Sequence, residues 1–251
     1  MKVSVIASGS QGNCVLLKSG RHSIMLDFGI SVRKFKIRLA ELGDELNGLD
    51  AIFISHEHRD HVSGLEYLSR KVNTPVFATE GTWEGMAWLE LENRVKVRAG
   101  DKVKIGGFEV QPFRVPHDAR EPVGYLIEAE DRKIGICTDL GSVNHLVRER
   151  LKGSDLVILE SNHDPQLLIA GKYPWPLKQR ILGRDGHLSN QDCAGLLAEI
   201  SHPGLCAAVL AHVSLDNNTP ELAFEASRGK LPEPAGLYVT HQRKAGPAIE
   251  L

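Results

Sequence analysis

The sequence predicts an α/β fold in which two β-sheets pack face to face with helices outside them, an αββα four-layer sandwich. Two observations favour this architecture. Short apolar segments typical of strands occur in two batches, and helical segments follow each batch. No linker-like stretch separates the batches, and 42% of the 251 residues are hydrophobic. We therefore expect a single domain over residues 1–251.

Strands and helices are expected in the first part of the chain. Its strands are predicted near residues 2–7, 13–18, 22–27, 49–54, 75–78 and 94–98. Helices are predicted near residues 32–42 and from His61 towards Lys71. The run from Leu49 to Ile54 is short and apolar, which is typical of a buried strand. Polar residues directly after this run should leave the sheet in a tight turn.

Further strands and helices are expected in the second part of the chain. Its strands are predicted near residues 102–106, 108–115, 123–130, 132–138, 155–160, 206–211 and 236–240. Helices are predicted near residues 142–151, from a capping box at Ser189-Asn190-Gln191-Asp192 to about Ile200, and from Pro220. Residues 163–186 contain three prolines and are predicted to be an irregular loop, of a length that usually serves function.

The hexapeptide His56-Glu57-His58-Arg59-Asp60-His61 is the most informative motif. Three imidazoles and a carboxylate follow the apolar run 49–54 directly. Neutral imidazole and carboxylate are ligands that suit zinc, manganese or iron. Histidines 56 and 58 can point to one side while Asp60 and His61 turn towards a second point. The motif therefore indicates two metal ions rather than one.

Two metal ions need more ligands than one hexapeptide carries. Three isolated residues, His117, Asp139 and His212, each follow an apolar, β-prone segment. The carboxyl ends of strands are where sheet-based enzymes collect their chemistry. We therefore expect these three side chains to join the hexapeptide in one site.

The order of these residues resembles the metallo-β-lactamase superfamily, in which an Asp after an early strand precedes HxHxDH, a lone His, a lone Asp and a final His. The resemblance implies the metallo-β-lactamase fold and a hydrolase with two divalent ions (Zn, Mn or Fe). Asp27 matches the early Asp, which supports the ligand loop from behind without binding metal. The implied ligands are His56, His58 and His117 for one ion, Asp60, His61 and His212 for the other, and Asp139 as the bridge.

Four further segments resemble the YycJ/WalJ-like branch of that superfamily, which is associated with exonuclease action on DNA. They are residues 8–13, 160–164, 186–190 and 212–218. This resemblance implies cleavage of phosphodiester bonds in nucleic acid, with DNA favoured over RNA. Weaker candidates for substrate contacts in these segments are Ser10, Asn13, Asn162, His163, Ser189, Asn217 and Asn218.

The chemistry follows from the metal ions. Two divalent ions roughly 3.5–4 Å apart can hold a bridging hydroxide as the nucleophile and clamp the phosphoryl oxygens. Asp60 is expected to orient that hydroxide or accept its proton. The leaving alkoxide needs a proton, and His187, directly before a capped helix, is the natural donor. The predicted catalytic residues are therefore Asp60 and His187.

A basic and aromatic stretch precedes His187. Lys172 precedes Tyr173 and Trp175, and three further basic residues follow them, Lys178, Arg180 and Arg184. Basic residues track phosphates and aromatic side chains stack on unpaired bases, so we expect the three basic residues to contact nucleic acid. The solvated face of a helix is the simpler interpretation of a second basic group, Arg33, Lys34, Lys36 and Arg38.

Composition restricts the class of protein. The formal net charge of -2 argues against a broadly basic nucleic-acid coat but allows a local basic strip. No apolar run approaches the roughly 18 residues of a membrane span, and no signal-peptide core is visible. We expect a cytoplasmic protein with no membrane partner. Reduced, buried thiols are expected for Cys14, Cys137, Cys193 and Cys206.

Four alternatives to a nuclease are considered, and the last two are disfavoured. A glyoxalase II-like thioester hydrolase would use the same ligands to activate water against an acyl carbon. A small-molecule or cyclic phosphodiesterase would not need the basic stretch. A non-enzymatic regulatory module is disfavoured because the set of ligands is intact. A β-lactamase is disfavoured because Asp139 stands where zinc-binding relatives of that kind commonly carry Cys.

Overall fold

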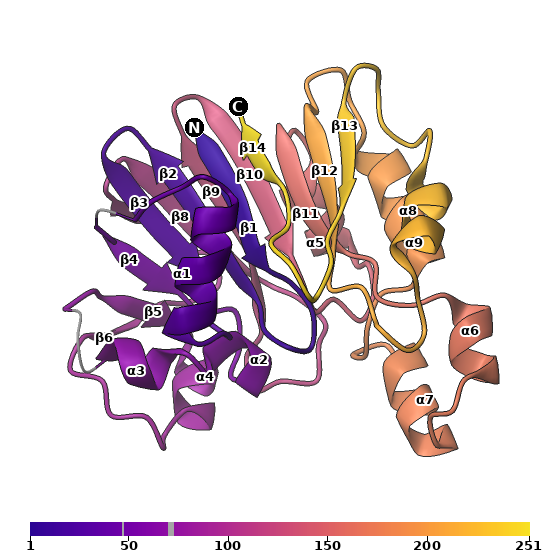
Figure 1. Ribbon diagram of the computed structural model, residues 1–251, viewed down its shortest axis with the longest axis horizontal. Coiled ribbons are helices and arrows are strands. Elements are labelled where there is room, and N and C mark those ends of the chain that lie inside the picture. Colours follow the sequence, from indigo (N-terminus) through magenta and orange to yellow (C-terminus); the bar gives the residue numbers. More distant parts are fainter. Residues whose placement is uncertain (47, 70–72) are drawn as a thin grey trace.

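The computed structural model describes residues 1–46, 48–69 and 73–251, and its strands form two sheets that face each other (Figure 1). The first sheet has the order β14-β1-β2-β3-β4-β5-β6. Strands β1 to β3 are antiparallel, whereas β3 to β6 are parallel. Their bounds are β1 Lys2–Ala7, β2 Cys14–Ser19, β3 His22–Leu26, β4 Ala51–Phe53, β5 Val76–Ala78, β6 Arg94–Lys96 and β14 Ala248–Glu250.

The second sheet has the order β13-β12-β11-β10-β9-β8-β7. Strands β7 to β10 form an antiparallel meander, whereas β10 to β13 are parallel. Their bounds are β7 Val103–Ile105, β8 Phe108–Arg114, β9 Val123–Ala129, β10 Arg132–Cys137, β11 Leu156–Glu160, β12 Ala207–Ala211 and β13 Gly236–Val239. Each sheet is therefore mixed, and long connections join the strands of its parallel part.

Helices lie outside the two sheets (Figure 1). The first half of the chain contributes α1 Val32–Glu41, α2 Arg59–Val62, α3 Leu65–Ser69 and α4 Glu80–Gly85. The second half contributes α5 His145–Leu151, α6 Pro165–Ala170, α7 Trp175–Leu182, α8 Asn190–Ile200 and α9 Pro220–Ser227. The predicted αββα layers are confirmed. No helix in the described ranges is long and apolar enough to cross a membrane.

Alternating side chains on the strands explain the four layers. In β2, Val15 and Leu17 belong to the core between the sheets, whereas Leu16 faces the helices of the first half. In β11, Ile158 joins the same central core, and Leu159 faces the helices of the second half. Successive side chains of a strand point to opposite faces, so strands that are apolar throughout must be covered on both sides.

The segment 163–186 differs from its prediction, because it contains helices α6 and α7 instead of an irregular loop. Its prolines stand where helices begin. Pro165 follows Asp164, whose side chain caps α6, and Pro176 lies in the first turn of α7. Proline is well suited to the first turn of a helix, where its missing N–H leaves no hydrogen bond unmade. The three prolines therefore mark helix starts.

Other expectations are corrected by the fold. Arg38 is buried and donates hydrogen bonds to the carbonyls of Ile6 and Gln242, so it is not part of a solvated helix face. Cys206 is exposed, unlike the other cysteines. The helix predicted from His61 is two short helices, α2 and α3, and its predicted end at Lys71 lies outside the described residues. Strand β14 and helix α4 were not predicted.

Candidate active site

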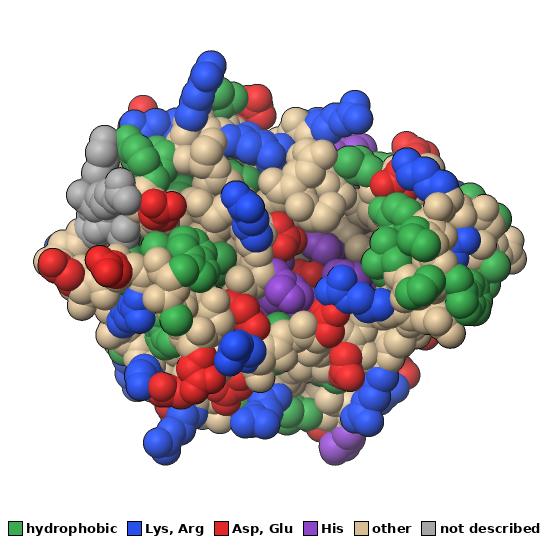
Figure 2. All heavy atoms as spheres, turned by 90° about the horizontal axis from the view of Figure 1, so that it is seen from below, with side chains coloured by type: hydrophobic (Ala, Val, Ile, Leu, Met, Phe, Trp, Pro, Cys, Tyr) green, Lys and Arg blue, Asp and Glu red, His purple; other side chains and the backbone are tan. Residues whose placement is uncertain are grey.

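The candidate site lies where parallel strands of both sheets end. Asp27, Asp139 and His212 come just after β3, β10 and β12, and each has a left-handed backbone, with φ of 56°, 53° and 54°. Such conformations are uncommon for residues other than glycine and cluster at functional sites. Seen from below, histidine and acidic side chains gather in a hollow of the surface, with Lys and Arg side chains near it (Figure 2).

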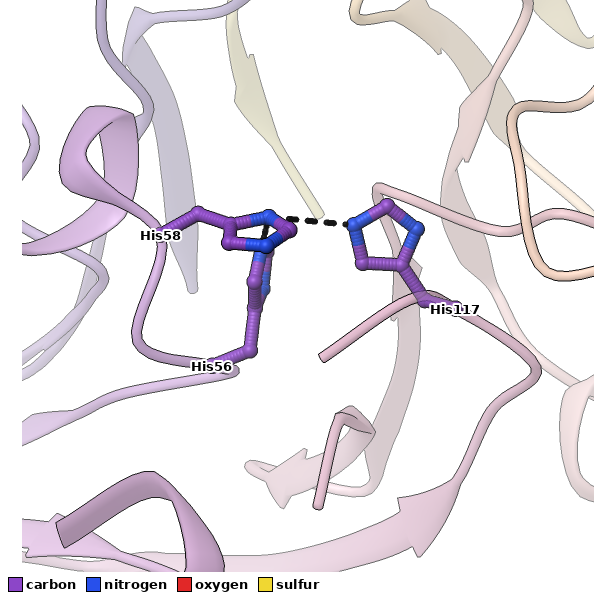
Figure 3. A group of neighbouring side chains, drawn as sticks. All are labelled: His56, His58 and His117. Atoms are coloured by element: carbon purple, nitrogen blue, oxygen red, sulfur yellow. Dashed lines mark hydrogen bonds between the residues drawn. The ribbon is translucent and has the colours of Figure 1, made fainter. Parts of the chain in front are cut away.

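One group of candidate ligands consists of His56, His58 and His117 (Figure 3). His58 Nδ1 lies 3.0 Å from His56 Nε2 and 3.3 Å from His117 Nε2. The hexapeptide supplies two of these rings and the segment after β8 supplies the third. Three imidazole nitrogens that converge on one point form a suitable metal site for zinc and related ions.

The second group consists of Asp60, His61 and His212. Asp60 Oδ2 lies 3.5 Å from His61 Nε2 and 3.5 Å from His212 Nε2. Asp139 connects the two groups. Its carboxylate oxygens lie 2.9 Å from His61 Nε2, 3.6 Å from His212 Nε2 and 3.8 Å from His117 Nε2. Asp139 is therefore the carboxylate within reach of both groups.

The pKa values and burial of these side chains are compatible with two bound metal ions. Burial and the neighbouring His61 lower the pKa of His56, which keeps that ring neutral and available to a metal. Burial opposes protonation of His61, but Asp27 and Asp139 outweigh burial and raise its pKa well above the usual value. His212 Nε2 is buried and makes no hydrogen bond. The buried carboxylates require positive charge, and divalent ions would supply it.

Residues behind the ligands fix their orientation. Asp27 Oδ1 accepts a hydrogen bond from Ser55 N at 2.8 Å, and Asp27 Oδ2 lies 2.8 Å from His61 Nδ1. Asn13 Nδ2 lies 2.8 Å from His61 Nε2 and 3.1 Å from Asp60 Oδ2. A carboxylate on the far nitrogen of a ligating imidazole sets the tautomer of the ring. Asp27 therefore stands where its expected supporting role requires it.

Glu160 is a site residue whose role was not predicted from the sequence. It is fully buried at the end of β11, and Glu160 Oε1 lies 2.8 Å from His187 Nδ1 and 2.9 Å from His212 Nδ1. Glu160 Oε2 accepts hydrogen bonds from Leu140 N and Leu188 N. Burial raises the pKa of Glu160, but His187 outweighs burial and lowers it to about 2. Its position as the charged residue that ends an apolar strand was the available signal.

His187 lies beside both ligand groups. Its ring centroid is 5.3 Å from that of His117 and 5.2 Å from that of His212. Burial disfavours its charged form, but Glu160 outweighs burial and raises the pKa of His187 above its usual value. Because Nδ1 faces Glu160, Nε2 is the nitrogen left for a reacting group. His187 thus combines proximity to the ligands with a retained proton.

Comparison with known proteins identifies the family. Residues 22–212, which include every candidate metal ligand, match the family described as Beta-lactamase superfamily domain. The chain belongs to this superfamily. It is 37% identical over 224 residues to Exodeoxyribonuclease YycJ of Bacillus anthracis, a match that covers 88% of this chain and 85% of that protein. It is 35% identical over 228 residues to Exodeoxyribonuclease WalJ of Streptococcus pneumoniae, with the same coverage.

Solved structures agree with this membership of the β-lactamase superfamily. Zn²⁺-bound PqqB from Methylobacterium extorquens superposes with a TM-score of 0.76 at 17% identity, over 100% of both chains. At that identity the likeness shows the fold. Together with the candidate metal groups and the relatives named above, it makes the chain a metal-dependent hydrolase of the metallo-β-lactamase fold.

Most of the weaker substrate candidates in this superfamily member have structural partners. Asn162 Nδ2 donates to His212 O at 2.9 Å, and Asn218 Nδ2 donates to Asn162 O at 3.0 Å. Ser189 caps α8. Ser10 differs from the others, because it is exposed in the loop after β1. The buried members of this set are Asn13, Asn162, His163, Ser189, Asn217 and Asn218.

The three basic residues that follow Trp175 differ in their exposure to solvent. Lys178 is buried, and its Nζ donates to Ile169 O at 2.7 Å and Gly171 O at 2.6 Å. The prediction that Lys178 contacts nucleic acid is therefore wrong, because its ammonium group is hydrogen-bonded to the end of α6. Arg180 is exposed, and its Nε donates to Asp118. Arg184 is also exposed.

Proposed function

We propose that this chain is a dinuclear-metal-dependent phosphodiesterase that acts as an exonuclease on DNA. The observation that carries the proposal is the pairing of Glu160 with His187 beside two groups of metal ligands. A histidine with a raised pKa, one nitrogen fixed and the other free, suits protonation of a leaving alkoxide. Hydrolysis of a thioester does not require such a donor, because a thiolate leaves readily.

Metal ions would supply an activated water and stabilise the charge that develops on the phosphoryl oxygens. In this proposal the chain's own residues do the positioning. Asp139 fixes the spacing of the two ligand groups, and Asp27 and Glu160 hold His61 and His212 by their Nδ1 atoms. The ligands assigned are His56, His58 and His117 on one side, Asp60, His61 and His212 on the other, and Asp139 between them.

Two residues orient or move protons in this scheme. Burial raises the pKa of Asp60, but His61 outweighs burial and lowers it, so the carboxylate is ionised at neutral pH and can orient the attacking water by accepting a hydrogen bond from it. His187 gives its proton to the leaving oxygen and regains it from solvent, to which its side chain is 22% exposed. Glu160 keeps the His187 ring oriented throughout this exchange.

The choice of DNA is supported by the relatives YycJ and WalJ, both named as exodeoxyribonucleases. The exposed arginines on and after α7 are consistent with a polyanionic substrate. Neither observation favours a small thioester or a cyclic phosphodiester as the substrate, although the metal ligands alone would allow both.

The deciding experiment incubates metal-reconstituted protein with end-labelled single-stranded DNA, duplex DNA and RNA. Bis(p-nitrophenyl) phosphate and S-lactoylglutathione serve as small substrates in parallel. We expect nucleotides to be released from one end of DNA, with slower action on RNA and none on the thioester. Preferential hydrolysis of S-lactoylglutathione would overturn the proposal, and cleavage at internal positions would overturn the exonuclease assignment.

A further inference from the structure

Helices α6 and α7 form a unit (residues 165–182, the α6–α7 unit) that lies beyond the carboxyl ends of β11 and β12 (Figure 1). Lys178 holds the unit together through its hydrogen bonds to the end of α6. Tyr173 Oη donates to Asp216 Oδ2 at 2.9 Å and fastens the unit to the loop after β12. The unit is therefore a fixed surface beside the site.

The outer surface of the α6–α7 unit is apolar. Ile169 is 56% exposed and Trp175 is 58% exposed. Hydrophobic side chains also gather on this side of the histidine-lined hollow (Figure 2). Leu167, Leu182 and Leu215 are exposed as well. A group of large exposed apolar side chains next to the candidate active site indicates a surface that binds a ligand or a partner.

Positive charge borders this apolar surface on the side of the metal site. Arg180 lies five residues after Trp175 in α7, which is a rise of about 7.5 Å along the helix and a rotation of about 140° around its axis. Its Nε donates to Asp118, and Asp118 Oδ1 lies 3.4 Å from His117 Nε2. The guanidinium group is thus separated from a metal ligand by one carboxylate, and its remaining N–H groups can serve a phosphate.

A second exposed tryptophan gives a comparison within the same molecule. Trp88 is 57% exposed, as Trp175 is, but it lines a surface pocket with three acidic residues, Glu66, Glu90 and Glu92, and one basic residue, Arg94. Acidic surroundings disfavour a polyanion, whereas Arg180 and Arg184 follow Trp175. The two tryptophans are therefore equally exposed, but the charge around them differs. This difference favours Trp175 over Trp88 as a contact for nucleic acid.

We propose that the α6–α7 unit binds an unpaired strand of the substrate next to the scissile phosphate, with Trp175 stacked on a base and Arg180 on a backbone phosphate. The inference rests on the proposed nuclease function and names the form of its substrate as single-stranded DNA or an unpaired end. Stacking on a tryptophan tolerates any base, so this contact favours unpaired bases without selecting a sequence.

Fluorescence tests the contact without requiring hydrolysis. Of the three tryptophans, Trp83 is 4% exposed, so in Trp88→Phe the exposed tryptophan is Trp175. Titration of this variant with phosphorothioate oligodeoxythymidylate should quench its emission, and a blunt-ended DNA hairpin should quench it far less. Equal quenching by both, or none by either, would overturn the stacking.

Kinetics test its consequence. Trp175→Ala should lower kcat/KM on a single-stranded oligonucleotide by about 5–100-fold relative to its kcat/KM on bis(p-nitrophenyl) phosphate. Trp175→Phe should restore most of the loss, and the matched control Trp88→Ala should change the ratio by less than about twofold. Thermal melts of all variants exclude loss of fold as the cause.

The outcomes separate this inference from the function on which it rests. Equal effects of Trp175→Ala and Trp88→Ala, in a protein that degrades DNA, would overturn the inference alone. Failure to hydrolyse any phosphodiester would overturn the proposed function, even if the oligonucleotide quenched Trp175. A change of oligomeric state in Trp175→Ala, measured by light scattering, would instead assign the surface to a second copy of the chain.

Discussion

Asp139 is the residue on which both candidate metal groups depend. Its carboxylate lies among His61, His117 and His212, and its backbone φ is 53°. Asn tolerates this conformation about as well as Asp, so Asp139→Asn removes charge without adding strain. We expect elemental analysis to find less metal per chain and a thermal melt to find a lower Tm. Full metal content and activity in this variant would contradict the bridging role.

His187 is expected to donate a proton without binding metal. His187→Ala should keep both metals yet lose on the order of 10²–10⁴ in turnover on an ordinary phosphodiester. The loss should be much smaller for a p-nitrophenolate leaving group, which departs without a proton. Rates on both substrates, with metal analysis as the control, test this role. Equal losses on the two substrates would indicate phosphate binding, and a lost metal would make His187 a ligand.

Glu160 should set the pH range in which His187 works. Burial disfavours the charged form of His187, but Glu160 raises its pKa, so the proton is retained to higher pH. The donating form disappears as pH rises through that pKa. In Glu160→Gln the raising charge is lost, and the alkaline fall in kcat should move to lower pH.

The control for Glu160→Gln is the same pH profile on bis(p-nitrophenyl) phosphate. Its leaving group needs no proton, so the alkaline limb should be weak in the wild type and unchanged in the variant. Glu160 also contacts His212, and metal analysis must accompany the profiles. An unchanged alkaline limb on DNA in a fully metallated variant would rule out this role for Glu160.

Among the elements, the end of helix α6 depends on Lys178. Lys178→Met keeps an unbranched side chain but leaves the carbonyls of Ile169 and Gly171 without a donor. We expect a cost of about 1–3 kcal/mol in the free energy of unfolding and faster hydrogen exchange within α6 and α7. Lys172→Met is the control, since its pair with Asp216 is exposed and should matter by less than about 1 kcal/mol. Equal effects would contradict the internal role.

Elements were predictable where a local pattern determined them. The hexapeptide at residues 56–61 and the capping box at Ser189 carry their own signals, and the structure has there a turn that leads into α2 and the start of α8. Helices α6 and α7 were missed because proline is read as a breaker unless its place in the first turn is known. The role of Glu160 was missed because it depends on contacts with His187 and His212 that the sequence does not bring together.

At the scale of the whole molecule, that the chain folds as one domain stays a prediction. Residues of both sheets, such as Phe53 of β4 and Tyr125 of β9, share the central core and contact each other with ring centroids 5.8 Å apart. Because each sheet covers the other, neither should persist alone. We expect amides of β2 and β11 to exchange through one global unfolding step, measured by hydrogen exchange with increasing denaturant. Loss of protection in one sheet first would contradict a single domain.

The layers followed from the sequence because strands that are buried on both faces are apolar throughout. One edge strand did not follow. Strand β14 has three residues, and it pairs with β1 at an end of the first sheet. Such a short strand has too few residues for a pattern, and it is defined by its partner instead.

The exposed thiol of Cys206 offers a position for selective chemical labelling. Burial raises the pKa values of Cys14, Cys137 and Cys193, which makes these thiols unreactive, so a maleimide dye should attach at one position per chain. Cys206 precedes β12 and His212 follows it, which separates the dye from the candidate metal centre by about 20 Å. A donor dye at that distance is suited to energy transfer with an acceptor on DNA, and it would report the arrival and departure of substrate while leaving the hollow unobstructed.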